Sequence, residues 1–209
     1  MKQIPFVSNH RDNMHCVNAV FRMVHQCYFG KDLTWKEIDS MTMAIPGKAT
    51  WTFIGEMEFA KKGLHVVNIE PVDYQKLHDE GVDYLKKILG NDTASYYLNK
   101  SNIVSVIKFI PQYLKVVYHE TRRASLGEIV KFLKQGKLIG VEINSRILNH
   151  KAGFSLHFVL LYDLDKDNNI ILHDPGLPPI KSRKITIIEF DQCFNFDGAN
   201  GGVTVFDRD

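Results

Sequence analysis

The chain of 209 residues is 44% hydrophobic and 11% aromatic, which is enough to bury a substantial core as one large domain or two small ones. Its formal net charge of +2 gives no large field of one sign, so we expect no nucleic-acid partner. The sequence begins without an apolar run of signal-peptide length, and no stretch approaches the roughly 20 apolar residues of a membrane helix. We therefore expect a cytoplasmic protein without a membrane segment.

The first quarter of the chain is predicted to be mainly helical. Apolar residues recur at helical spacing from Cys16 until Gly30, which is expected to end the helix. Thr34 and Glu37 have the spacing of a capping box, which predicts a second helix from Trp35. The remaining elements expected here are an extended arm or edge strand at 3–7, a helix at 51–62 and a strand at 64–69.

The middle of the chain is predicted to contain a helical insertion at about 71–112. Its apolar pattern fits two or three helices with a break near Gly90. A strand is expected at 115–118. Ser125 and Glu128 then form a second capping box, which predicts a helix to Lys134, and a further strand is expected at 138–143.

The last third of the chain has the composition of a sheet. Strands are predicted at 155–164 and 169–173, and the polar turn at 165–169 joins them as a hairpin. Two more strands are predicted at 185–190 and 202–206. We therefore expect one α+β domain over 1–209, with an N-terminal helical part packed on a C-terminal antiparallel sheet.

Cys16 is placed at the start of its helix, where two interpretations compete. A lone cysteine is often a small core residue. Independently of the role of Cys16, Asp12 or Asn13 is expected to cap the helix. Alternatively, the unpaired N–H groups of a helix start favour a thiolate and lower the pKa of the cysteine. Cys16 and Cys27 would lie about 16 Å apart on one helix, too far for a disulfide, so reduced thiols are expected.

The predicted hairpin supplies the partners that a nucleophilic cysteine requires. His157 lies near the start of its first strand and Asp174 at the end of its second, so the two side chains can be cross-strand neighbours. A thiolate needs a general base, and the base needs a third group that fixes its orientation. Cys16, His157 and Asp174 can fill these roles. Each of the last two also has a structural interpretation, as a buried core histidine and as the first residue of a turn.

The order of these motifs resembles a known family. A cysteine at a helix start, the strand His157–Asp163 and the segment Ile170–Pro175 are similar to the papain-like cysteine peptidases of the bacteriocin-leader-processing type (cysteine peptidase family thirty-nine) and their stand-alone relatives. The segments Ile4–Val7 and Ile187–Phe190 extend the resemblance, which thus covers the two ends of the chain. Residues 71–112 match nothing in that family and would be an insertion over the cleft.

The resemblance implies a papain-like fold and a cysteine-dependent hydrolase that acts on a peptide or protein substrate without a cofactor. It assigns Cys16 as nucleophile, His157 as general base and acid, and Asp174 as the orienting carboxylate. Papain-like enzymes usually have an oxyanion-stabilising glutamine six residues before the cysteine, where this sequence has His10. We take Asn9, one position earlier, as the candidate donor, with His10 as the alternative.

Three other functions remain open from the sequence. A zinc site is disfavoured because no Cys-x-x-Cys, His-Glu-x-x-His or His-x-His motif is present, so no metal is expected. A papain-like acyltransferase, deamidase or transglutaminase-like enzyme would use the same thioester with another acceptor. A non-catalytic relative could bind peptides in the old cleft. The sequence does not indicate the oligomeric state.

Overall fold

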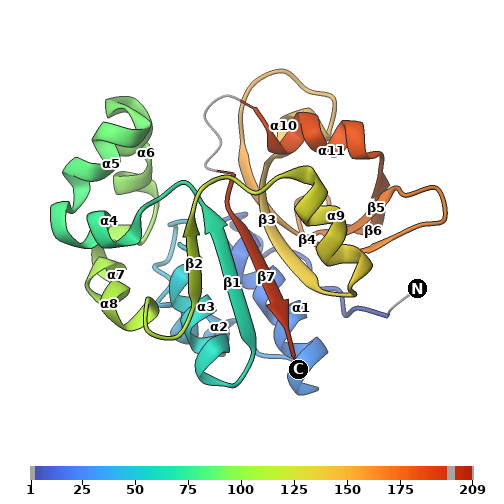
Figure 1. The fold of residues 1–209 in the computed structure, drawn as a ribbon, viewed down its shortest axis with the longest axis horizontal. Coiled ribbons are helices and arrows are strands. Elements are labelled where there is room, and N and C mark those ends of the chain that lie inside the picture. The colour runs from blue at the N-terminus through green and yellow to red at the C-terminus, as the bar shows by residue number, and fades with distance from the viewer. Residues whose placement is uncertain (1–2, 197–200, 209) are drawn as a thin grey trace.

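The computed structural model describes residues 3–196 and 201–208, which form a seven-stranded sheet covered by helices on both faces (Figure 1). The strand order is β2-β1-β7-β3-β4-β5-β6. Every adjacent pair is antiparallel except β1 and β2, which are parallel. The strands are β1 (His65–Glu70), β2 (Tyr118–Thr121), β3 (Leu138–Asn144), β4 (Leu156–Leu164), β5 (Ile170–Asp174), β6 (Ile180–Ile185) and β7 (Val203–Asp207).

One face of the sheet is covered by α1 (Cys16–Phe29), α2 (Trp35–Thr42) and α3 (Phe53–Lys61), which lie behind the sheet in Figure 1. Phe21 of α1 is fully buried there, in edge-to-face contact with Phe59, Phe158 and Phe206. This aromatic cluster joins α1 to α3 and to two strands of the sheet. It therefore fixes the helix that begins at Cys16 against the strand that carries His157.

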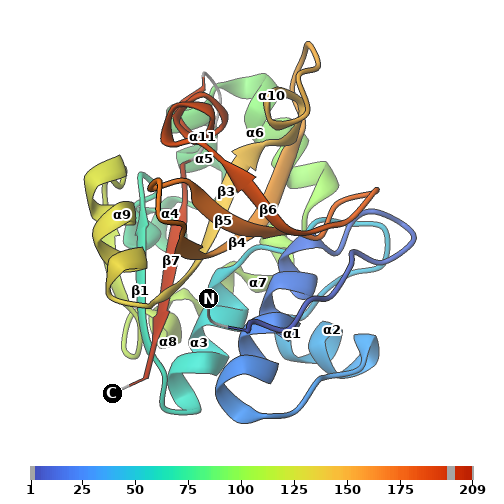
Figure 2. The same cartoon turned by 90° about the vertical axis from the view of Figure 1, so that its right-hand side faces the viewer.

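The opposite face of the sheet is covered by α9 (Leu126–Lys134), α11 (Ile187–Phe194) and the short α10 (Ser145–Leu148). In Figure 2 the sheet separates α9 from α1. The second core under these helices includes Ile129, Leu133, Ile139, Phe190 and Val205. The central strands β3 and β4 contribute residues to both cores, as expected of strands covered on both faces.

A group of short helices lies beside the β1–β2 edge of the sheet (Figure 1). It comprises α4 (Tyr74–Glu80), α5 (Val82–Leu89), α6 (Asn91–Lys100), α7 (Ile103–Val106), the 3₁₀ helix η1 (Ile107–Phe109) and α8 (Ile110–Tyr113). The predicted helical stretch at 71–112 is thus divided into more and shorter helices than expected, and a break falls at Gly90 as predicted. A hydrogen bond connects this group of helices to the segment before α3. Trp51, in that segment, donates through Nε1 to Oγ of Ser101, which follows α6, at 2.9 Å.

The mixed α and β class predicted from the sequence is confirmed, and the predicted hairpin is present as β4 and β5. The sheet, however, also takes in β1 and β2 from earlier in the chain, and their pairing is parallel. The strand predicted at 185–190 is wrong. The strand ends at Ile185, and α11 begins at Ile187 because Thr186 and Glu189 form a capping box.

Among the described residues, no helix combines the length and the apolar character needed to cross a bilayer.

Candidate active site

The start of α1 is not capped by a side chain. Its N-cap residue is His15, and Asp12 instead accepts hydrogen bonds from the Met14 N–H and from the His15 ring. The prediction that Asp12 or Asn13 caps this helix is therefore wrong. The first N–H groups of a helix have no intrahelical partner, so the uncapped end of α1 directs positive partial charge at the Cys16 thiol.

Cys16, His157 and Asp174 come together at the end of the sheet. His157 is 8% exposed and Asp174 is 3% exposed, and His157 Nε2 lies 2.7 Å from Asp174 Oδ1. Because Nε2 is engaged by Asp174, Nδ1 is the ring nitrogen left for the Cys16 thiol, and the interaction of thiol and imidazole shifts the pKa of both groups. The Phe158 backbone N–H also interacts with this thiol and lowers its pKa. His157 thus interacts with Asp174 on one side and with Cys16 on the other.

The pKa values of this group are shifted in opposite directions. Burial raises the pKa of the Cys16 thiol, but the hydrogen bond and the charge of His157 lower it by more, and the net pKa lies below the usual value. Burial lowers the pKa of His157, yet hydrogen bonds with Asp174 and Cys16 raise it to about 9. Both shifts favour a thiolate beside an imidazolium, the ionic form of an activated cysteine.

Asp174 is held by two further donors. Its Oδ1 accepts the Gly176 N–H at 2.9 Å, and its Oδ2 accepts Arg183 Nη1 at 3.2 Å. Arg183 also donates to the backbone oxygen of Leu148 and to Asn149 Oδ1. Because these contacts keep Asp174 charged and fixed, Arg183 is a positioning residue. The sequence reasoning missed it, since it lies in a run of basic residues that is typical of a solvated face.

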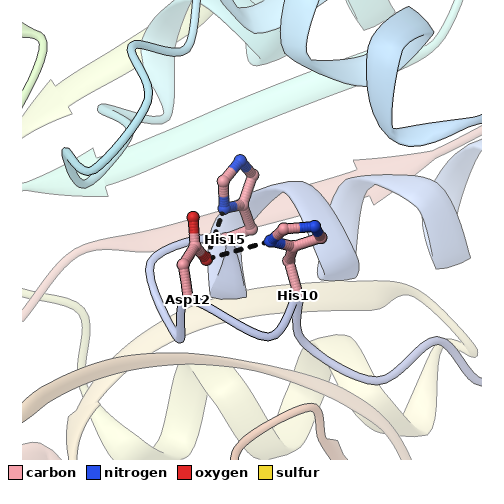
Figure 3. Close-up of side chains that lie close together, drawn as sticks. All are labelled: His10, Asp12 and His15. Atoms are coloured by element: carbon pink, nitrogen blue, oxygen red, sulfur yellow. Dashed lines mark hydrogen bonds and ion pairs between the residues drawn. The ribbon is translucent and has the colours of Figure 1, made fainter.

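The two candidate oxyanion donors, Asn9 and His10, lie in the segment before α1. Asn9 is buried, and its side-chain oxygen accepts the His15 N–H while its Nδ2 donates to Asn13 Oδ1 at 3.1 Å. His10 lies with Asp12 and His15 in a separate cluster (Figure 3), in which Asp12 Oδ1 is 3.3 Å from His10 Nδ1 and 2.9 Å from His15 Nδ1. Neither Asn9 nor His10 lines the cleft described next.

A cleft of about 330 Å³ opens over the cysteine. Cys16, His157 and Asp174 line it together with Asn13, which precedes Cys16 by three residues. Helix α6 contributes another wall through Tyr96, Tyr97 and Lys100. The helices at 71–112 therefore border the cleft. The sequence predicted that these helices cover the cleft, and in the structure α6 forms one of its walls.

Comparisons with known proteins add little. No protein-family model matches the sequence, and neither does any curated protein sequence. Among solved structures, the chain is similar to a double glycine motif protease from an AMS/PCAT transporter, solved in complex with the leader peptide. The two are 13% identical with a TM-score of 0.49, over 99% of this chain and 93% of that one. This likeness is too low to carry over an activity or a substrate.

A set of buried carboxyl groups lies farther along the sheet. Glu56 of α3 is fully buried and accepts hydrogen bonds from Tyr113, Thr204 and Asn68. Glu70 of β1 is 4% exposed, and it accepts the Tyr74 hydroxyl and lines the cleft. Burial and the neighbouring charges of Glu56 and Glu142 raise the pKa of Glu70 to about 8. The sequence reasoning did not find this group, because its members are far apart in the chain.

Proposed function

We propose that this protein is a papain-like, cysteine-dependent hydrolase that cleaves peptide bonds through a thioester intermediate. Cys16 is the nucleophile, His157 the general base and acid, and Asp174 the residue that orients the imidazole. The single observation that carries this proposal is the placement of His157 between Asp174, to which it is hydrogen-bonded, and Cys16, with which it interacts and which lines a cleft. The proposed catalytic unit comprises the whole chain, with the helices at 71–112 as an insertion beside the cleft.

In the proposed first step, the Cys16 thiolate attacks the carbonyl carbon of the scissile bond, and the carbonyl oxygen becomes an oxyanion. His157 gives its Nδ1 proton to the leaving amine as the carbon–nitrogen bond breaks, which leaves a thioester on Cys16. The neutral His157 then removes a proton from water, and the resulting hydroxide attacks the thioester. The acid product leaves, and the thiolate and imidazolium form again. Asp174 keeps the imidazole aligned throughout.

The oxyanion needs at least two donors. The Cys16 backbone N–H is available as one because it belongs to the first turn of α1. For the second we propose Asn13 in place of Asn9 or His10. Asn13 lines the cleft beside Cys16, and the donation from Asn9 to its side-chain oxygen fixes the orientation of its amide. Asn13 also has a positive φ of 59°, a conformation that asparagine tolerates better than most residues.

Selective alkylation tests the nucleophile, with the other two cysteines as internal controls. At pH 6 a low concentration of iodoacetamide should modify Cys16 much faster than Cys27, because Cys16 has a depressed thiol pKa. Cys193 is buried and its pKa is raised to about 11, so it should stay unmodified. Peptide mapping by mass spectrometry gives the three rates.

The companion test measures hydrolysis of a mixed library of quenched fluorescent peptides. Cys16→Ala and His157→Ala should each abolish cleavage, and circular dichroism should show that both variants stay folded. His157→Ala should also slow the alkylation of Cys16 at pH 6. If Cys16→Ala retains full activity, or if Cys16 reacts no faster than Cys27, the proposal fails.

A further inference from the structure

Three side chains of metal-binding type lie close together in the segment before α1. His10, Asp12 and His15 each offer one nitrogen or oxygen atom, and these three atoms lie within 4.8 Å of one another (Figure 3). None of the three residues lines the cleft over Cys16. The cluster is therefore separate from the candidate active site, and the proposed reaction does not use it.

The distances within the cluster suit a tetrahedral metal ion. Asp12 Oδ1 lies 3.3 Å from His10 Nδ1 and 2.9 Å from His15 Nδ1. Zinc binds imidazole nitrogen and carboxylate oxygen at about 2.0–2.2 Å, and tetrahedral angles then put neighbouring ligand atoms about 3.3–3.6 Å apart. Small side-chain movements bring the cluster to that spacing. Two imidazoles and one carboxylate also suit zinc better than calcium or magnesium, which prefer oxygen ligands alone.

His10 provides a second observation that points to a ligand. Its Nδ1 is buried and has no hydrogen-bond partner among the described residues, because the 3.3 Å contact with Asp12 Oδ1 is not a hydrogen bond. A buried polar atom without a partner costs free energy. A metal ion beside Asp12 would take up the lone pair of this nitrogen. The His10 side chain as a whole is 43% exposed, which leaves a path for the ion from solvent.

His15 is already oriented as a metal ligand would be. Its Nδ1 faces Asp12, and its Nε2 lies 3.4 Å from Asp39 Oδ1. Histidines that bind a metal through one ring nitrogen almost always direct the other toward a carboxylate, a carbonyl or water, which fixes the ring and its tautomer. Asp39 is itself held in place, because Asn18 Nδ2 donates to its Oδ1 at 2.7 Å. The cluster therefore has an outer layer of supporting contacts.

The cluster spans the loop that leads into α1. His15 is the N-cap residue of that helix, and Asn13 lies in the loop between Asp12 and His15. An ion bound to His10, Asp12 and His15 would cross-link this loop to the first residue of the helix. Because the ion would lie outside the cleft, it would stabilise the loop without taking part in the reaction.

We propose that His10, Asp12 and His15 form a structural zinc site, with the fourth coordination position open to water. The site goes beyond the proposed function and does not depend on it. No metal was expected from the sequence, because the His-x-Asp-x-x-His pattern of these residues mixes histidine with a carboxylate and matches none of the zinc motifs considered.

Titration of the untagged Cys16→Ala protein with zinc chloride tests the site, because this variant cannot bind zinc through the Cys16 thiol. The protein is first treated with EDTA and dialysed. Trp35 reports on the site by fluorescence, since its ring centroid lies 5.4 Å from that of His10 and 5.5 Å from that of His15. We expect one zinc ion per chain. Zinc should also raise the midpoint of urea unfolding, because it binds the folded protein in preference to the unfolded chain.

Substitutions in the same protein assign the ligands. Replacing a residue that only supports a ligand weakens metal binding about 10–100-fold, so Asp39→Asn should have an effect of that size. His10→Ala and Asp12→Asn remove direct ligands and should weaken binding by about 100-fold or more. Both residues are partly exposed, so circular dichroism should show that the variants stay folded.

His78→Ala is the matched control for these variants. His78 forms an exposed pair with Asp79 at 3.0 Å, and among the described residues the pair has no third ligand beside it. The control should therefore keep the full affinity for zinc. Equal losses in His78→Ala and His10→Ala would mean that zinc binds scattered surface histidines, which overturns the inference.

The inference is also overturned if the Cys16→Ala protein binds no zinc, or if His10→Ala and Asp12→Asn bind it as tightly as their parent. Absence of binding would assign the contacts to a protonated His15 held between Asp12 and Asp39. These outcomes are distinct from failure of the proposed function, which would appear as slow alkylation of Cys16 or absence of hydrolysis and would leave zinc binding unchanged.

Discussion

His157 donates through Nε2 to Asp174 at 2.7 Å, so its other nitrogen faces Cys16. This one contact sets both the orientation and the charge of the imidazole. A buried imidazole would ordinarily lose its proton, but hydrogen bonds with Asp174 and Cys16 raise the pKa of His157 to about 9. The protonated ring in turn stabilises the thiolate. Asp174 therefore acts on the nucleophile through His157.

Replacing Asp174 should lower both the rate and the alkaline limit of activity. Asp174→Asn removes the negative charge that holds the His157 proton, so the pKa of His157 should fall below about 9. The imidazolium that protonates the leaving amine is present only below that pKa, so the alkaline limb of the kcat profile should move to lower pH. We expect kcat to fall about 10²-fold, a smaller loss than in Cys16→Ala.

The control for this variant is Asp163→Asn. Asp163 belongs to the same hairpin but does not line the cleft, so its substitution should leave the pH profile unchanged. An Asp174→Asn protein with a reduced kcat and an unmoved alkaline limb would mean that the carboxylate contributes to folding of the site and not to the charge of His157.

Asn13 is predicted to contribute to oxyanion stabilisation. Asn13→Gly removes the amide but keeps the left-handed backbone conformation, which glycine adopts without strain. If Asn13 donates to the oxyanion, kcat should fall about 10²–10³-fold while KM changes little. His10→Ala should retain most of the activity, because His10 does not line the cleft. The opposite pattern, in which only His10→Ala loses activity, would assign the donor to His10.

The parts of the fold that follow from local rules could be predicted from the sequence. Gly30, Thr34 and Ser125 mark helix ends through backbone and capping chemistry that involves only nearby residues, and all three helices were placed correctly. Thr186 carries the same signal, with Glu189 three residues later. The β-branched run around it nevertheless favoured a strand, and the capping box decided the structure.

The candidate site was predictable only in part, for a similar reason. His157 and Asp174 could be paired because a short turn joins their strands, so their proximity follows from local chain reversal. Arg183 reaches Asp174 from β6, and the cleft combines Glu70 of β1 with Glu142 of β3, which come from distant parts of the chain. Such contacts depend on strand order, which a single sequence does not specify.

The space around two helical glycines, Gly127 in α9 and Gly55 in α3, predicts opposite effects of alanine substitution on stability. Gly127→Ala in α9 meets no atom closer than Ser125 Oγ at 3.9 Å, so it should stabilise the protein by about 0.5–1 kcal/mol. A Cβ at Gly55 in α3 would lie 2.1 Å from Phe21 Cε2. Because Phe21 is fully buried, Gly55→Ala should destabilise the protein by about 1–3 kcal/mol. Urea unfolding of both variants measures the difference, and equal stabilisation by both would contradict this packing.

Glu70 should make the stability of the protein depend on pH in a defined window. Burial and the charges of Glu56 and Glu142 raise its pKa to about 8 in the folded state, compared with an ordinary value of 4.5. Between these values the folded protein holds a proton on Glu70 that the unfolded chain has lost. The contribution of Glu70 to the free energy of unfolding is therefore fully present below about pH 4.5 and is lost as the pH rises to about 8.

The variant Glu70→Gln keeps a neutral side chain of similar shape at every pH. Its free energy of unfolding relative to the wild type should therefore increase between pH 5 and pH 8.5, by an amount on the order of a few kcal/mol. Glu58→Gln, which changes an exposed ion pair with Lys61, should show almost no such change. Urea unfolding at the two pH values gives both differences. A Glu70→Gln protein that is equally destabilised at pH 5 and pH 8.5 would show that Glu70 is ionised throughout this range and that Tyr74 and its other neighbours hold it as a carboxylate.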